Sequence, residues 1–314
     1  RLPQNQTNKL QLLQTGMSEL ELWLKDLIRN GLADLPERPK KYWTAMADRL
    51  VDAEAPIIAH TLHTLSKVPV KQKDWPELYL RQLGQLYLFV QGFNHWDILS
   101  PETQADLKTA VGWLPTQCGN LEINDTWLVL GRTQEVYGRH RRLLTWLWGI
   151  SSQRPAAFIQ AIKSGKATSN HYTTGTCLNG PIQFFAGNWP IFGFQSAPPT
   201  ITKNQDSVDF GFDFIDNAVN DYTQVKATVP WLPFFPMLLK QVKPIRNDGV
   251  WLLVDEAGTI LPVVAPFSFG WHLAGFSNGR NLTLFGIWDG TAFDPISVET
   301  DQGWLDLRIL RGVR

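Results

Sequence analysis

The sequence predicts an α+β protein in which an N-terminal helical bundle is followed by an antiparallel β-rich domain with inserted helices. Up to about residue 114, apolar residues recur every three to four positions, as they do on one face of a helix. From about residue 115, short runs of aromatic and β-branched residues are bounded by turn residues, which is typical of strands. We therefore expect a linker or tail over residues 1–14, a helical bundle domain over 15–114 and a β-rich domain over 115–314.

The first helix is expected over residues 15–35, because its start, its apolar face and its end are all specified locally. Ser18 and Glu21 have the spacing of a capping box, and Asn30-Gly31 is a typical helix stop. The apolar stripe consists of Leu20, Trp23, Leu24, Leu27 and Ile28.

Four more helices are expected before residue 114. Helical spacing resumes over 42–52, and Pro56 suits the first turn of the next helix. Asp74 and Glu77 form a second capping box before a helix over 78–90. Ser100-Pro101-Glu102 supplies a cap, a first-turn proline and an acidic first turn for a helix that ends near Gly112. Five helices with short connections predict a bundle.

The second half is expected to contain mostly strands. Two helices are inserted, a brief one over 155–163 and a longer one over 213–229. Residues 277–279 (Ser-Asn-Gly) are typical of a hairpin turn. The expected strands lie at 126–134, 143–151, 181–194 (one or two strands), 250–255, 259–264, 270–276, 282–288 and 292–298.

Composition excludes several function classes. The 314 residues have no formal net charge and only 18 % are charged, so the overall basic balance of a nucleic-acid binder is missing. Two cysteines are too few for a disulfide framework and favour a reducing compartment. No apolar run is long enough for a membrane span, and no signal peptide is evident. We expect a cytoplasmic protein and, because the chain begins at Arg1, a fragment or processed product.

Two motifs suggest catalysis but have simpler explanations. GFSNG at 275–279 matches the letters of a hydrolase nucleophile elbow, which requires a strand before the serine and a helix after it. The residues after Ser277 alternate like a strand, so a hairpin turn explains them better. SGKAT at 164–168 lacks the first glycine and the hydroxyl residue of a phosphate loop. We therefore assign no catalytic residue.

Metal binding is also not predicted. His60 and His63 lie one helical turn apart, but no third or fourth ligand follows at zinc spacing. Solvated histidines explain the pair more simply. Cys118 and Cys177 lack a cysteine or histidine partner at metal spacing and are expected to be unpaired thiols.

One local basic cluster is a candidate contact for nucleic acid or an acidic partner. It consists of Arg132, Arg139, Arg141 and Arg142 around an expected hairpin. A solvated turn is the alternative explanation. The acidic residues of Trp288-Asp289-Gly290 and Asp294 also fit turn chemistry, and no arrangement requires an acid–base pair.

Several segments together resemble a known family. They are GMSELELWLKDLIRNGLADL, RLVDAEAP, WLVLGRTQEVYGRHRRLLTWLWG, GVWLLVDEAGTILPV and FGIWDG. Over about residues 15–298, the chain resembles the C-terminal region of bacterial SWIM zinc finger proteins. In that family a CxC…CxH zinc module lies upstream, followed by a linker. This chain has no such motif, so no zinc ligand is assigned, and zinc is expected only if an upstream finger exists.

The resemblance implies a bacterial, cytoplasmic protein that acts with a MoxR-type AAA+ ATPase and a von Willebrand factor A protein. It implies no activity for this region. We therefore favour a non-catalytic protein-interaction module. A nucleic-acid-binding protein that uses the arginine cluster is the first alternative, and a hydrolase built on Ser277 is the second.

Overall fold

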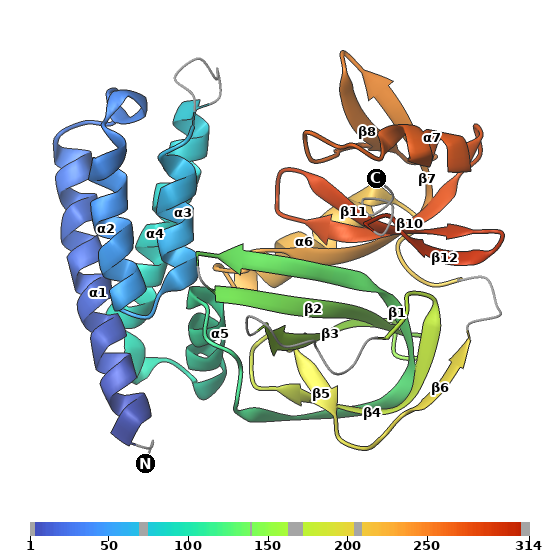
Figure 1. The fold of residues 1–314 in the computed structure, drawn as a ribbon, viewed down its shortest axis with the longest axis horizontal. Helices are drawn as coiled ribbons and strands as arrows, with labels where there is room; N and C mark the ends of the chain where they lie inside the picture. The colour runs from blue at the N-terminus through green and yellow to red at the C-terminus, as the bar shows by residue number, and fades with distance from the viewer. Residues whose placement is uncertain (1–3, 69–74, 139, 163–171, 204–208, 309–314) are drawn as a thin grey trace.

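The computed structural model describes residues 4–68, 75–138, 140–162, 172–203 and 209–308. A bundle of helices stands on one side, and two six-stranded antiparallel sheets with two further helices stand on the other (Figure 1). The expected α+β class, with a helical bundle before a β-rich part, is confirmed.

The bundle contains five α-helices and two short 3₁₀ turns among the described residues. Ser100 caps the last helix, since its hydroxyl accepts a hydrogen bond from the backbone N–H of Thr103, and Gly112 ends it in the left-handed conformation. The helices are α1 (Gln4–Arg29), α2 (Lys40–Asp52), α3 (Pro56–Leu65), α4 (Trp75–Asn94) and α5 (Pro101–Val111), with η1 at Leu35–Glu37 and η2 at Trp96–Ile98.

The expected linker or tail over residues 1–14 is wrong from residue 4 onward, because α1 begins at Gln4. Leu13 and Met17 extend the apolar stripe of this helix and are fully buried, so they stabilise its first half by packing. Lys9 pairs with Glu54 at 3.2 Å, and its ammonium lies over the ring of Trp113. Ser18 lies in the middle of the helix and donates to the carbonyl of Gln14 instead of capping. Asp74 of the second capping box lies outside the described residues.

The first sheet has the strand order β3-β2-β1-β4-β5, with β6 also paired to β4. A parallel bridge between Ala157 and Phe192 brings the segment before β5 against β3, so the sheet curls toward closure. Its strands are β1 (Cys118–Tyr137), β2 (His140–Gly149), β3 (Arg154–Ala161), β4 (Thr176–Phe185), β5 (Gly193–Gln195) and β6 (Thr200–Lys203).

The brief helix expected over residues 155–163 is wrong, because residues 154–161 form strand β3. The segment pairs with β2 along its whole length, from Gly149 opposite Arg154 to Arg142 opposite Ala161. Ala156 and Ala157 point to opposite faces and are both fully buried. Burial on both faces and the ladder of hydrogen bonds outweigh the local helix propensity.

The second sheet has the order β12-β11-β10-β7-β8-β9. Helix α6 confirms the expected helix near 213–229, and β8, β9, β10 and β11 confirm four expected strands. The strands are β7 (Phe235–Asn247), β8 (Val250–Val254), β9 (Ile260–Pro262), β10 (Leu282–Trp288), β11 (Phe293–Thr300) and β12 (Gly303–Asp306), and the two helices are α6 (Ile215–Thr228) and α7 (Gly270–Ser277).

The strand expected over residues 270–276 is wrong, because this segment is helix α7. Gly270, Leu273 and Ser277 are buried at helical spacing. Gly270 lies so close to the indole of Trp251 that a Cβ would meet it at 1.9 Å. Asn278 ends the helix in the left-handed conformation, so residues 277–279 form a helix end and not a hairpin turn.

Three apolar clusters hold these parts together. The largest joins the bundle to the second sheet and α6. A second fills the space between the two sheets, and a third lies on the opposite face of the first sheet, within its curl. The bundle and the β-rich part therefore share one continuous core, and their relative position is set by packing.

Asp125 on β1, beside the turn that joins β2 to β3, provides a test of this fold. Its carboxylate accepts hydrogen bonds from the backbone N–H groups of Thr126, Ser151 and Ser152, at 2.7 to 3.1 Å. Burial opposes ionisation, but the hydrogen bonds, those of Ser152 foremost, outweigh it and lower the pKa of Asp125.

We predict that Asp125→Asn lowers the free energy of unfolding by about 2 kcal/mol at pH 7, because a charged acceptor is lost. Because the pKa of Asp125 is lower in the folded state, its carboxylate stabilises the protein at pH values above the unfolded-state pKa, near 3.9. This stabilisation is lost as the pH falls through the folded-state pKa. Urea denaturation should therefore show a smaller difference from wild type at pH 3 than at pH 7. Exposed Asp48, substituted in the same way, is the control; equal effects at both positions would contradict the prediction.

Candidate functional site

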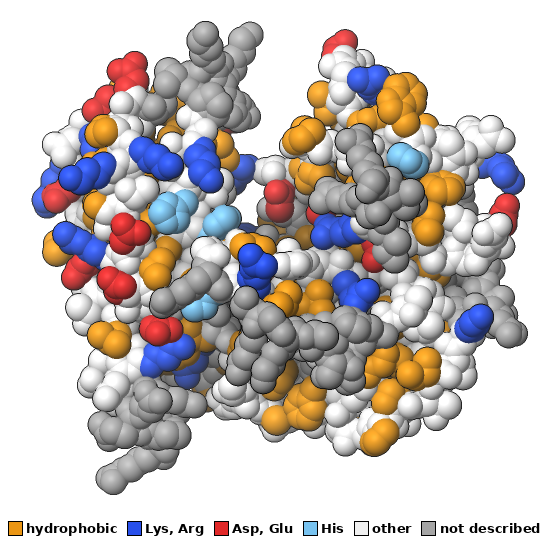
Figure 2. All heavy atoms as spheres, viewed as in Figure 1, with side chains coloured by type: hydrophobic (Ala, Val, Ile, Leu, Met, Phe, Trp, Pro, Cys, Tyr) orange, Lys and Arg blue, Asp and Glu red, His pale blue; other side chains and the backbone are white. Residues whose placement is uncertain are grey.

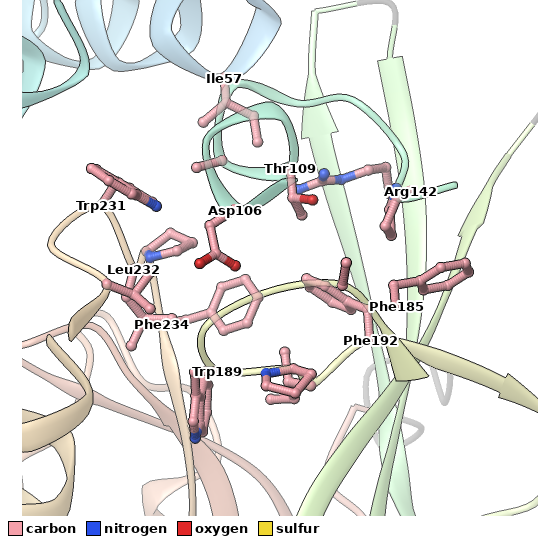
Figure 3. Close-up of a pocket in the computed structure, with 17 residues that line it drawn as sticks. Ile57, Asp106, Thr109, Arg142, Phe185, Trp189, Phe192, Trp231, Leu232 and Phe234 are labelled. Atoms are coloured by element: carbon pink, nitrogen blue, oxygen red, sulfur yellow. The ribbon is translucent and has the colours of Figure 1, made fainter. Parts of the chain in front are cut away.

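A cavity lies where the bundle, the first sheet and the segment after α6 meet (Figure 3). The centre of a water-sized molecule can occupy about 60 Å³ of it, which suits a few waters or one apolar side chain. Rings and prolines dominate its walls. They are Phe185, Trp189, Phe192, Trp231 and Phe234, with Pro115, Pro190 and Pro233.

The aromatic walls are held by ring contacts with the core. Trp189 stacks on Phe235 with centroids 5.2 Å apart, and Phe234 meets Trp146 edge to face at 5.4 Å. The ammonium of Lys226 donates to the carbonyl of Leu232 at 2.8 Å, and burial lowers the pKa of this lysine to about 8. These contacts tie the walls to the core of the protein.

Asp106 on α5 ties the loop after β4 to the bundle. Its carboxylate accepts from the backbone N–H of Asn188 at 2.9 Å and from the side-chain amide at 2.8 Å. A Cβ at Gly187 would lie 2.5 Å from this carboxylate, so the loop approaches α5 closely because residue 187 is glycine. Burial raises the pKa of Asp106, and the bonds from Asn188 oppose that rise only in part.

Arg142 enters the same cavity from β2. Its Nε and Nη2 atoms donate to Glu135 Oε2 at 3.0 and 2.6 Å, and its guanidinium lies 5.3 Å from the ring centre of Tyr137. The residue is only 6 % exposed, and no described residue accepts a hydrogen bond from its Nη1 atom. In Figure 3 the end of this side chain points toward Thr109 on α5.

A wider cleft opens next to the cavity, between α5 and the β1–β2 end. The centre of a water-sized molecule can occupy about 800 Å³ of this cleft. The residues that line both the cavity and the cleft are Thr109, Pro115, Arg142 and Ala186. Among the side chains that line the cleft, several are positively charged and one is a carboxylate. The ionisable residues that line it are Lys9, Lys108, Arg141, Arg142, His140 and Glu54, with Tyr137 among its aromatic walls.

The structure does not gather the predicted arginine cluster on one surface. Arg132 is half-buried on β1 and acts electrostatically on Asp306 of β12, on the side of the second sheet. Arg141 is exposed and faces the cleft, whereas Arg142 is buried and bonded to Glu135. Arg139 lies outside the described residues. Across the face in Figure 2, Lys and Arg side chains on the bundle are interspersed with Asp and Glu.

Sequence reasoning missed the aromatic cavity. Its signal was the density of rings and prolines in NWPIF at 188–192 and PWLPFFP at 230–236. The pair of Glu135 and Arg142 was also predictable, because the two residues face each other in the register of the β1–β2 hairpin.

The hydrolase hypothesis gains no support from the geometry. Ser277 is the last residue of helix α7 and precedes strand β10, the reverse of a nucleophile elbow, and its hydroxyl donates to the carbonyl of Arg280. Asp289 accepts from two backbone N–H groups in its own turn, and Asp294 pairs with Arg308. SGKAT at 164–168 lies outside the described residues.

The metal hypothesis gains none either. Within the described ranges, no three His, Cys, Asp or Glu side chains come close enough to hold a metal ion. The ring of His60 packs edge-on to Tyr137 with centroids 5.3 Å apart. No disulfide joins Cys118, which is exposed, to Cys177, which is buried.

Comparison with known families identifies the helical part. Residues 8–111 match the SWIM-associated four-helix bundle domain, so α1 to α5 form this domain and the resemblance to the C-terminal region of SWIM zinc finger proteins is confirmed here. The match starts inside the segment expected to be a linker. No curated protein and no solved structure matches the chain. Among the described helices, none has the length and apolar character that crossing a bilayer requires.

We predict that Asp106 makes the stability of the protein fall with rising pH over a defined window. Its raised folded-state pKa means that the folded protein keeps a proton that the unfolded chain releases. The free energy of unfolding should therefore decrease as the pH rises from about 3.9 through the folded-state pKa, and level off above it. Asp106→Asn, followed by urea denaturation between pH 3 and 7, should lack this decrease. A decrease that persists in the variant would assign it to another group.

Proposed function

We propose that this protein is a non-catalytic interaction module of a SWIM zinc finger-like protein. It binds a segment of a partner protein in the cleft between the helical bundle and the β-rich part. The observation that carries the proposal is the aromatic and proline-lined cavity at this junction. Buried aromatic anchors and preformed pockets are the features in which protein interfaces concentrate their binding energy.

The size and chemistry of the cavity favour a peptide side chain over a cofactor. The inner space takes about one side chain, and the wider cleft outside it takes the rest of a peptide segment. The candidate catalytic groups Ser277, Asp289 and Asp294 are engaged in hydrogen bonds of turns or in an ion pair. These contacts support a role in binding. The family resemblance points to a MoxR-type AAA+ ATPase and a von Willebrand factor A protein as partners.

A blocking substitution tests the cavity. Thr109 faces both spaces, and its hydroxyl donates to the carbonyl of Ala105, one turn earlier. We predict that Thr109→Phe fills the entrance and reduces partner recovery at least ten-fold in affinity purification from the encoding organism, measured by quantitative mass spectrometry. The ATPase and the von Willebrand factor A protein are the partners to quantify first.

Thr64→Phe is the matched control. Thr64 is exposed on α3, its hydroxyl makes the same bond one turn back, to His60, and it lines neither space. Circular dichroism should show that both variants are folded. Equal recovery with wild type and Thr109→Phe, or equal loss with both variants, would refute binding at this junction.

Nucleic-acid binding is the second candidate, and the excess of positive charge in the cleft, beside Tyr137, favours it. This alternative predicts that the combined change of Arg139, Arg141 and Arg142 to Ala weakens binding to DNA or RNA at least ten-fold. Binding should also fall steeply between 50 and 200 mM salt. Electrophoretic mobility shifts measure both. Arg132→Ala is the control, because this side chain faces away toward Asp306; unchanged binding in the triple variant would exclude the alternative.

A further inference from the structure

We infer that the partner segment bound at this junction is acidic. This inference rests on the proposed function and specifies the chemistry of the bound peptide. A carboxylate of the partner peptide accepts a hydrogen bond from Arg142 Nη1. An apolar side chain next to that carboxylate enters the aromatic cavity.

The first support is the unused donor of Arg142. Two atoms of its guanidinium fork are bonded to Glu135, which holds the group in one orientation. Nη1 is buried and has no acceptor among the described residues, and Arg142 lines both the cavity and the cleft. Buried polar groups in native proteins are almost always paired, so Nη1 lacks an acceptor that a ligand bound at this junction can supply.

The second support is the charge around this donor. Glu135 balances Arg142, and Glu54 balances Lys9 at 3.2 Å. Lys108 and Arg141 remain as positive charges that line the cleft. The cleft therefore favours an anion at its Arg142 end.

The third support is the position of Asp106 within the inner cavity. Its carboxylate lies among the aromatic walls and repels a second anion there. The ligand's charge is therefore kept at the Arg142 side, while an apolar group fits the inner space.

A peptide carboxylate fits this arrangement better than a nucleic-acid backbone. A phosphate chain is bound by a row of exposed cations, whereas Arg142 is 6 % exposed and has a single guanidinium nitrogen, Nη1, without a partner. Aspartate, glutamate or a chain terminus supplies one carboxylate beside an apolar residue. The planar guanidinium is the group best suited to a carboxylate.

Selection from a phage-displayed library of random 12-residue peptides, with the full chain as bait, tests the inference. We expect enriched peptides to carry Asp or Glu next to Leu, Phe or Trp. For a synthetic enriched peptide, fluorescence anisotropy should show at least ten-fold weaker binding after Arg142→Gln. Replacing the acid of the peptide with its amide should weaken binding by the same factor.

Glu135→Gln separates recognition from mere loss of structure. The amide still accepts from Arg142 but no longer balances its charge, so the acidic peptide should bind about three-fold more tightly. Arg246→Gln is the matched control, because its guanidinium also lies over aromatic rings, those of Trp251 and Trp271, away from the cleft. Its affinity should equal that of wild type.

The outcomes separate the two proposals. If enriched peptides lose binding with Thr109→Phe but not with Arg142→Gln or with the amide peptide, acidic recognition is overturned and the binding module stands. If no enriched peptide is sensitive to Thr109→Phe, both are overturned. If a 20-nucleotide oligouridine displaces the peptide and itself depends on Arg142, the ligand is nucleic acid and the acidic-peptide inference fails.

Discussion

The rest of the structure depends on the burial of both faces of the first sheet. Strands β1 and β2 place Leu128 and Trp146 against the second sheet, and Trp127 and Leu147 within the curl of their own sheet. Because neither face is left for water, the register of this hairpin is strongly specified. The register in turn sets Glu135 opposite Arg142 and directs the Arg142 guanidinium toward the bundle. The candidate site is therefore a consequence of apolar packing several residues away.

The bundle is attached to this sheet by a few directional contacts and one shared core. Asp106 holds Asn188, and the indole N–H of Trp113 donates to the carbonyl of Glu54 at 2.8 Å, where the chain leaves the bundle. The apolar cluster that joins the bundle to the second sheet fixes the position of the bundle relative to the β-rich part. A cleft between two such anchored parts has walls that are already positioned, so the protein itself loses little conformational entropy when a peptide binds.

Two errors of the sequence-based predictions have a common physical cause. Segments 155–163 and 270–276 have ambiguous local patterns, and their state depends on tertiary packing. The first pairs with strand β2, and the second buries Gly270, Leu273 and Ser277 at helical spacing. Helix α1 begins earlier than expected. Leu13 and Met17 continue its apolar stripe at helical spacing, which is a local signal, whereas the ion pair of Lys9 with Glu54 has none.

By itself, the sequence determined the helical bundle, the change to strands near residue 115 and the family of residues 8–111, because helix spacing and caps act within a few residues. The sequence also identified Arg141 and Arg142 as candidate binding residues. Only the tertiary structure decided that Arg132 lies toward Asp306, that Arg142 is buried with one unpaired donor, and that aromatic residues from distant segments form one cavity. The cavity residues span positions 57 to 234, and the contacts that join them depend on packing across the whole chain.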